Sequence, residues 1–260
     1  MWHVPLRIER AYQQALLNLL RRAPNGSLFK KLTEAAALRM VSRVSFENAK
    51  DWRQAAQQGM QGDVLYRALQ KELSGAVGKR VRELIAENAQ LISSVPEQAR
   101  LQVARQAARE NWAGRRSFGS KLANRWQQMT KSRARMIART ETSKATTALT
   151  QARSEQSGLR WYVWRSSKDQ RVRFSHRFMA RDGGVLIPWT EPPAPEALVG
   201  EKSTLGYYHA GNCPNCRCYP EPLLRMSQVQ WPHRVYLNGR VQMMTRAQFM
   251  PLAGKEVRAA

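Results

Sequence analysis

The three cysteines of this 260-residue chain fall in one short segment, Cys213-Pro-Asn-Cys216-Arg-Cys218. They follow a stretch rich in Pro and Gly, and one of the four histidines, His176, lies upstream of it in a polar block. Cysteines that are few and clustered are the wrong pattern for a disulfide framework, and they suggest a reducing compartment. The pattern therefore predicts a small unit that is tied together at this segment, by a metal or by tight side-chain pairing.

Zinc is one hypothesis for the cluster, because three thiolates and one imidazole form a known closed, tetrahedral ligand set. Cys213-x-x-Cys216 has the spacing of a zinc knuckle, whereas Cys216-x-Cys218 is a less comfortable pair. One of the three cysteines can therefore be a spare, with His209 as the substitute ligand. The expected ligands are His176, Cys213, Cys216 and Cys218.

Asp169 opens two alternatives to a structural zinc site. In the first, the cysteines are a reduced cluster in a core, and His176 is hydrogen-bonded to Asp169 or to the backbone. In the second, Asp169 and His176 form the acid/base or metal pair of a nuclease. No second carboxylate lies at a spacing that would indicate a catalytic pair, so we expect no catalytic site. Asp169 is instead expected to cap a helix at 171 and, like Asp182, to pair with Arg171 and Arg173.

Residues 1–157 show the apolar spacing of amphipathic helices. Pro96 is expected to end one of them, because the residue before a proline avoids the helical region. Gly158 is expected to end the last one as its C′ residue. In the third helix, Phe46, Trp52 and Ala55 are expected on one side. The expected helices cover residues 6–22, 28–45, 46–59, 64–93, 96–112 and 120–157, with a break near Thr130.

The composition changes at Gly158. Residues 159–165 alternate bulky, β-branched and aromatic side chains, which indicates a strand, and 185–187 indicate a second one. A short helix is expected over 171–180, and residues 188–212 are irregular, which in a compact unit is typical of a functional or tied-down loop. Asn238-Gly239 between apolar residues predicts a hairpin, paired with itself or added to a neighbouring sheet.

These patterns predict an α+β fold, with a predominantly helical N-terminal region and then a small unit of short strands and irregular loops. We expect three regions. They are a helical region over 1–157, a small α+β core with the cysteine cluster over 158–225, and a C-terminal extension with a hairpin over 226–260.

Positive charge dominates the surface chemistry. The chain has 43 Lys and Arg against 19 Asp and Glu, a net charge of +24. Such a surface attracts polyanions and binds nucleic acid without reading its sequence, although an acidic protein partner would also suit it. The densest basic stretch is 100–144. The residues expected near nucleic acid are Arg105, Arg109, Arg115, Arg116, Lys121, Arg125, Lys131, Arg133 and Arg135.

Several function classes lack their signatures in this sequence. No run of apolar residues is long enough for a membrane span, and the N-terminal residues show no signal-peptide core, so export is not expected. The sequence also has no phosphate-binding Gly-rich loop, no serine nucleophile elbow and no His-Glu-x-x-His motif. A non-enzymatic role is expected.

Four stretches, taken in order, resemble the phage Mu F-like minor head proteins, also called phage head morphogenesis proteins. They lie at 87–96, at 134–142, at 164–176 with Asp182-Gly183, and at 215–218, so the resemblance covers roughly 80–220. The Arg139-Thr140-Glu141 segment is expected to form a helix seam that packs on the strand unit through Ala145, Ala148 and Ala152. The residues that carry the family pattern are Arg139, Thr140, Glu141, Trp164, Asp169, Arg171, Arg173, His176, Gly183, Cys216, Arg217 and Cys218.

The resemblance implies a low-copy minor capsid protein of a tailed phage, bound inside the head at the portal vertex and close to the packaged DNA. It implies the portal protein, the major capsid or scaffold protein, and double-stranded DNA as partners. It also implies a place in the virion head, and in the host cytoplasm during assembly. A metal-dependent nuclease or toxin-like module on the same fold, using Asp169 and His176, is the alternative.

The sequence departs from the pattern of many relatives at the candidate metal site. Those relatives carry Cys-x-x-Cys after the Asp-x-Arg-Val block, and His-Pro-x-Cys-Arg-Cys at the end. In this chain Arg173 and His176 stand at the first pair, and Cys213 stands at the second histidine. The resemblance therefore leaves the identity of the ligands open.

Overall fold

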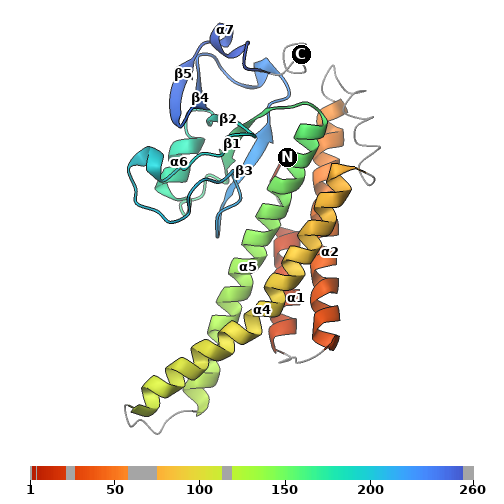
Figure 1. The fold of residues 1–260 in the computed structure, drawn as a ribbon, viewed down its shortest axis with the longest axis vertical. Helices are drawn as coiled ribbons and strands as arrows, with labels where there is room; N and C mark the ends of the chain where they lie inside the picture. Colours follow the sequence, from red (N-terminus) through yellow and green to blue (C-terminus); the bar gives the residue numbers. More distant parts are fainter. Residues whose placement is uncertain (1, 4, 22–26, 58–74, 113–118, 254–260) are drawn as a thin grey trace.

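The computed structural model describes residues 2–3, 5–21, 27–57, 75–112 and 119–253, and for residues 21, 27, 56–57, 95–112, 119–127 and 129 it describes the backbone alone. Long helices make up its N-terminal part and lie side by side, and the strands lie at one end of them (Figure 1). Helices α4 and α5 run on beyond α1 and α2, away from the strands. The long helices are α1 (Leu6–Arg21), α2 (Ser27–Gln57), α4 (Ala76–Trp112) and α5 (Gly119–Gln156).

Burial of apolar stripes holds these helices together. Leu16 of α1, Met40 of α2, Leu84 of α4 and Leu149 of α5 are each at most 2% exposed and belong to one apolar core. Burying a side chain of this size contributes about 1.5–3 kcal/mol relative to leaving it in water. No described helix is both long and apolar enough to cross a membrane.

Three expected helix breaks are wrong. Helix α4 continues through Pro96, α2 continues across residues 45 and 46, and α5 continues past Thr130. A proline inside a helix costs about 3 kcal/mol, because it removes one hydrogen bond and clashes with the preceding turn. The preceding turns of α4 bury Leu84 and Ile92 in the core, and we attribute the continuation of the helix to this packing.

The expectation that Phe46, Trp52 and Ala55 share one side of their helix is wrong for Phe46, whereas Trp52 and Ala55 pack in one core. Trp52 is fully buried, whereas Phe46 is 64% exposed. The two residues are six positions apart, which is about one and two-thirds helical turns, so they lie on different faces. The region 58–74, where the expected helix over 64–93 begins, lies outside the described residues.

A five-stranded mixed sheet follows the helices in the described chain, which makes the protein α+β as predicted. The strand order is β3-β1-β2-β4-β5, and all neighbours are antiparallel except β2 and β4. The strands are β1 (Trp161–Ser166), β2 (Leu186–Pro188), β3 (Cys218–Pro222), β4 (His233–Leu237) and β5 (Arg240–Met244). Three short helices lie between strands, namely α6 (Phe174–Ala180), η1 (Ala197–Val199) and η2 (Met226–Gln228), and α7 (Arg246–Phe249) follows β5.

The central strand β1 is buried on both faces. Successive side chains of a strand point to opposite faces. Trp161 and Val163 accordingly join a core with Trp52 of α2, whereas Tyr162 and Trp164 join the core that contains the three cysteines. One face of the sheet thus contacts the end of the helical part, and the other covers the candidate site.

The loop before β3 is docked on helix α5. Thr147 donates a hydrogen bond to the Ala210 carbonyl (2.7 Å), and the Asn215 amide donates one to the Thr140 hydroxyl (3.1 Å). Gly211 lies between these contacts with a φ of +93°. The expected small-residue seam is wrong, since its members pack in the helical core instead. These are Ala145, Ala148 and Ala152.

The predicted hairpin at Asn238-Gly239 is confirmed. Asn238 and Gly239 have φ values of 52° and 78°, as a two-residue turn with both residues left-handed requires, and β4 and β5 pair on either side of it. The hairpin extends this chain's own sheet through β4, whose Val235 pairs with Leu186. The sheet therefore takes strands from both sides of residue 226, and the expected three-region division stays a prediction.

Gly211→Ala tests the contact between the loop and α5. A Cβ at this position would lie 2.4 Å from the Thr147 hydroxyl oxygen and 3.0 Å from that of Ser143. We expect the free energy of unfolding, measured with denaturant, to fall by about 1–3 kcal/mol more than in Gly206→Ala, because overpacking adds to backbone strain. Gly206 is the matched control, since it has a φ of +68° and nothing within 4 Å. Equal losses in the two variants would contradict the docking.

Candidate metal centre

Three elements bring the cluster together on one face of the sheet. Helix α6 presents His176, which is 1% exposed. The turn over Cys213–Cys216 is closed by a hydrogen bond from the Cys216 amide to the Cys213 carbonyl (3.1 Å), with Asn215 left-handed at φ 55°. Cys218 begins β3 and pairs with Ser166 of β1. The start of α6 at Phe174 is later than the expected 171.

The sulfur atoms surround the imidazole of His176. Cys218 Sγ and Cys216 Sγ lie 3.3 Å and 3.6 Å from Nδ1, and Cys213 Sγ lies 3.8 Å from Nε2. The potential ligand atoms of His176, Cys213 and Cys216 all lie within 4.8 Å of one another, and the three residues are buried. This group could hold a metal ion, because buried thiolate and imidazole donors suit zinc and similar metals.

Two residues of the site carried no recognisable signal in the sequence. Tyr208 lies 2.9 Å from His176 Nε2 and donates to both carboxylate oxygens of Glu196, at 2.7 and 2.8 Å. Ser175 also donates to Glu196 (3.2 Å). Both Glu196 and Tyr208 belong to the long irregular stretch, which the sequence indicated only as a functional or tied-down loop.

Arg173 closes the cluster on another side. Its Nη1 atom donates to Cys213 Sγ (2.6 Å) and its Nη2 atom to the Pro214 carbonyl (2.8 Å). The expected pairing of Arg173 with Asp169 or Asp182 is therefore wrong. The guanidinium group of Arg173 therefore places a positive charge beside the Cys213 thiol.

The cluster favours one thiolate among its three sulfurs. Hydrogen bonds from the Cys213 and Cys218 thiols hold the pKa of Cys216 well below its ordinary value. The hydrogen bond to Cys216, with burial, raises the pKa of Cys213, and burial raises the pKa of Cys218. Since a metal binds thiolates, its binding would release protons from the other two cysteines.

Asp169 is not part of this group in the described structure. Its carboxylate accepts a hydrogen bond from the Arg171 amide (2.9 Å) and forms an ion pair with Arg217. Because α6 begins only at Phe174, Asp169 does not cap it. The alternative in which His176 is hydrogen-bonded to Asp169 or to the backbone is not what the structure shows, since the partner of Nε2 is the Tyr208 hydroxyl.

Of the other family-pattern residues, Trp164 contacts the cluster, and the others named here pair with residues outside it. Arg139 pairs with Glu9 of α1 (3.0 Å), and Glu141 pairs with Lys144 one turn further along α5 (3.2 Å). The Trp164 ring packs edge-on against the imidazole of His176, with centroids 5.4 Å apart. Gly183 has a φ of +83°, and its carbonyl accepts a hydrogen bond from Arg165 (2.6 Å).

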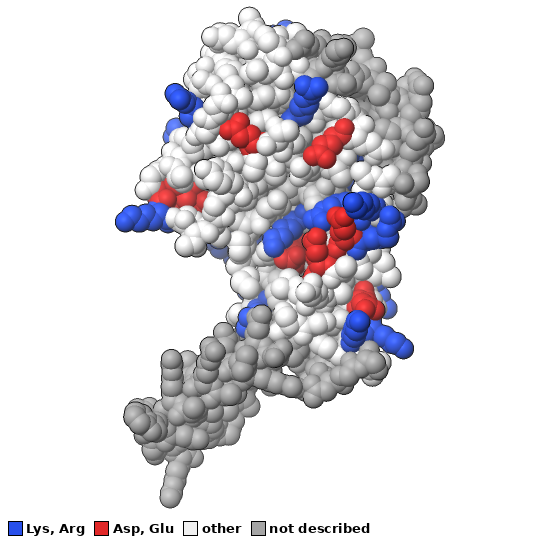
Figure 2. Space-filling model, in the orientation of Figure 1, with Lys and Arg blue, Asp and Glu red and all other residues white. Residues whose placement is uncertain are grey.

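The structure describes the side chains of only a few of the residues expected near nucleic acid. On α5, Lys131 and Arg135 are exposed and Arg133 is half-buried. On the face in Figure 2, described Lys and Arg side chains lie among Asp and Glu side chains rather than in one continuous basic patch. The side chains outside the description are Arg105, Arg109, Arg115, Arg116, Lys121 and Arg125.

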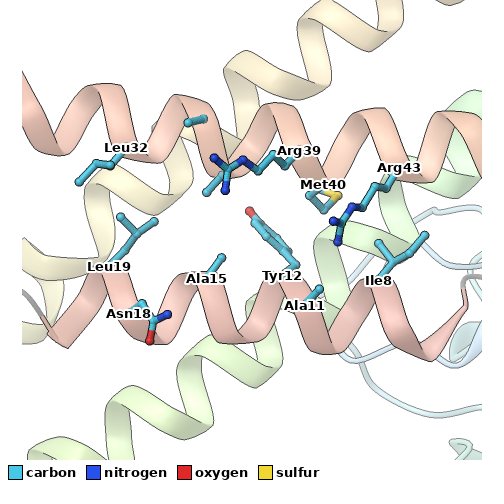
Figure 3. Close-up of a pocket in the computed structure, with 12 residues that line it drawn as sticks. Ile8, Ala11, Tyr12, Ala15, Asn18, Leu19, Leu32, Arg39, Met40 and Arg43 are labelled. Carbon is cyan, nitrogen blue, oxygen red and sulfur yellow. The ribbon is translucent and has the colours of Figure 1, made fainter.

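A groove of about 300 Å³ lies between α1 and α2. Tyr12 lies in its lining and points toward α2, and Arg39 and Arg43 of α2 lie on either side of it (Figure 3). The two arginines are the charged residues of the lining, and most of the rest is apolar: Ile8, Ala11, Ala15, Leu19, Leu32, Ala35, Ala36 and Met40. This groove between α1 and α2 is a candidate binding surface.

His209, the expected substitute ligand, lies against Tyr162 and Trp189 instead. Its Nδ1 atom is 3.2 Å from the Tyr162 hydroxyl, and it is not part of the described ligand group. Burial lowers the pKa of His209 to about 4 from the ordinary 6.5.

This shift predicts a loss of stability in mild acid. Between about pH 6.5 and pH 4 the unfolded chain binds a proton at His209 that the folded chain does not, so the free energy of unfolding falls as the pH falls. The full effect is on the order of 3 kcal/mol. Denaturant unfolding measured from about pH 7 to pH 5 should show a shallower slope in His209→Gln than in the parent. An unchanged slope would be evidence against a neutral, buried His209.

Comparisons with known proteins found a relative and a family model that match this chain. An uncharacterized protein of Haemophilus influenzae is 36% identical over 151 residues, a match that covers 57% of this chain and 30% of that protein. No solved structure matches significantly. The family model described as "Phage Mu protein F like protein" matches residues 49–220, which include α5, the sheet strands β1 to β3 and the whole cluster. This chain belongs to the phage Mu protein F-like family.

Proposed function

We propose that this protein is a minor capsid protein of a tailed bacteriophage, acting in head morphogenesis from the interior of the head at the portal vertex. The observation that carries the proposal is the family match over residues 49–220. The role is structural and requires no catalytic residue. In this role the protein would be in the host cytoplasm during assembly and then in the virion.

The groove between α1 and α2 supports a contact with an acidic segment of the portal protein. Arg39 and Arg43 are one helical turn apart, so both can pair with carboxylates on one face of a partner helix. The apolar lining would bury the remainder of that face. A second copy of this chain is a poor occupant, because a net charge of +24 opposes self-association. Contacts with the major capsid or scaffold protein would use other surfaces.

Quantitative mass spectrometry of purified procapsids and mature virions tests this role. We expect a few copies per portal in both particles, and absence from particles would overturn the proposal. The double variant Arg39→Glu, Arg43→Glu should lower the copy number by at least about tenfold, because like charges then face each other. The matched control is Arg10→Glu, Arg53→Glu, two exposed arginines on the same helices outside the groove lining. Equal effects of the two double variants would eliminate the groove as the contact.

Contact with packaged double-stranded DNA is the second part of the proposal. The net charge of +24 and the exposed Lys131 and Arg135 support it. Binding through phosphate contacts is independent of sequence and weakens steeply with salt. In a titration with duplexes of unrelated sequence, we expect equal affinities and a linear fall of log affinity with log salt. A sequence preference that persists at high salt would count against this mode.

We also propose that the cluster holds one structural zinc ion. His176, Cys213 and Cys216, whose ligand atoms lie within 4.8 Å of one another, would be three of the ligands. Cys218 is outside that group, but its sulfur lies 3.3 Å from His176 Nδ1, and it would be the fourth ligand of a closed tetrahedral site. The buried donors, drawn from α6, the Cys213–Cys216 turn and the start of β3, fit such an ion. Bound zinc would cross-link these elements and contribute directly to folding.

Elemental analysis of protein purified without chelator should give about one zinc per chain. His176→Asn should lose the zinc, whereas His209→Asn, at a buried histidine outside the group, should keep it. Chelation should lower the Tm, because binding energy is folding energy. Metal-free protein whose Tm does not respond to added zinc would end this part of the proposal.

A further inference from the structure

We propose that Glu196 and Tyr208 orient His176 so that Nδ1, and not Nε2, is the metal-binding atom. Both are positioning residues, since they act through the imidazole. The inference rests on the proposed metal site, but the state of the imidazole it requires can be measured without a metal.

The hydrogen bonds of Tyr208 and Glu196 determine which ring nitrogen of His176 carries the proton. A carboxylate only accepts, and a tyrosine hydroxyl has one hydrogen to donate. Tyr208 uses that hydrogen for Glu196, at 2.7 and 2.8 Å from its two oxygens. The 2.9 Å contact between Tyr208 and His176 Nε2 must then be donated by the ring, so Nε2 carries the proton.

The lone pair of a neutral His176 is therefore on Nδ1. That atom faces Cys218 Sγ at 3.3 Å and Cys216 Sγ at 3.6 Å. Nε2 lies farther from the nearest sulfur, Cys213 Sγ at 3.8 Å, and is already engaged by Tyr208. A histidine ligand that donates its other N–H to a fixed acceptor keeps its tautomer and ring orientation.

The chain itself holds the two positioning residues in place. Glu196 is 6% exposed and Tyr208 8% exposed. The Tyr208 amide donates to the Pro193 carbonyl (2.9 Å), and Ser175, next to His176 on α6, donates to Glu196 (3.2 Å). The carboxylate is thus anchored from both the loop and the helix.

The first experiment measures the tautomer in metal-free, reduced protein by ¹⁵N NMR of the His176 ring. We expect the proton on Nε2 and an unprotonated Nδ1 in the neutral ring. Nδ1–H as the main form would overturn the inference, whatever the metal content of the protein. This readout uses the unmodified chain, so it does not depend on whether a variant folds.

The second experiment measures Zn²⁺ affinity by competition with a chelator, and the absorption spectrum of the Co²⁺-substituted protein. Tyr208→Phe and Glu196→Gln should each weaken Zn²⁺ binding about 10–100-fold and change the Co²⁺ spectrum. The matched controls are Tyr207→Phe and Glu201→Gln, exposed residues of the same loop, which should leave both readouts unchanged.

The outcomes separate this inference from the metal site itself. If the parent chain binds no Zn²⁺, the proposed metal site fails, and so does the role of Nδ1 as a ligand. If the parent binds Zn²⁺ but folded Tyr208→Phe and Glu196→Gln keep its affinity and the Co²⁺ spectrum, the positioning role alone is overturned. Weakened binding with an Nε2–H tautomer in the parent would support it.

Discussion

Burial of strand β1 on both faces is the constraint on which the rest of this structure depends. Trp161 and Val163 face the core shared with the end of the helical part, and Tyr162 and Trp164 face the core with the cysteines. A strand in this position needs a covering layer on each side, because no face is left for water. The sheet thereby connects the long helices to the cluster, although none of the cluster residues lies on a long helix.

The cluster is a buried polar group that the fold satisfies from several directions. Arg173 supplies a positive charge at Cys213, whereas Tyr208 and Glu196 hold the far side of the imidazole. Helix α5 holds the loop that carries the cysteines, through Thr147 and Thr140. A buried network of this kind is stable only when its members have partners, and here each of them is bonded to another element.

The pattern of successes and errors in the sequence predictions has a physical explanation. The strand β1, the Asn238-Gly239 hairpin and the end of α5 before Gly158 were predicted correctly, because alternation, a two-residue turn and a left-handed glycine are local features. The continuation of α4 through Pro96 was missed, because helix packing can outweigh the local cost of a proline. The assignment of Ala145 to a seam with the strands was wrong for a related reason, since small residues do not reveal which neighbour they face.

The sequence by itself determined the α+β class, the family resemblance and the grouping of His176 with the cysteines as a candidate site. These rest on local periodicity and on residue types whose chemistry restricts their use. Only the tertiary structure brought Glu196 and Tyr208 to His176 and moved Asp169 to Arg217. Tyr208 is 32 residues from His176 along the chain, and no sequence pattern between the two residues indicates that contact. Such pairings depend on how a long irregular loop folds back over a sheet, which is decided by packing and hydrogen bonding between distant segments.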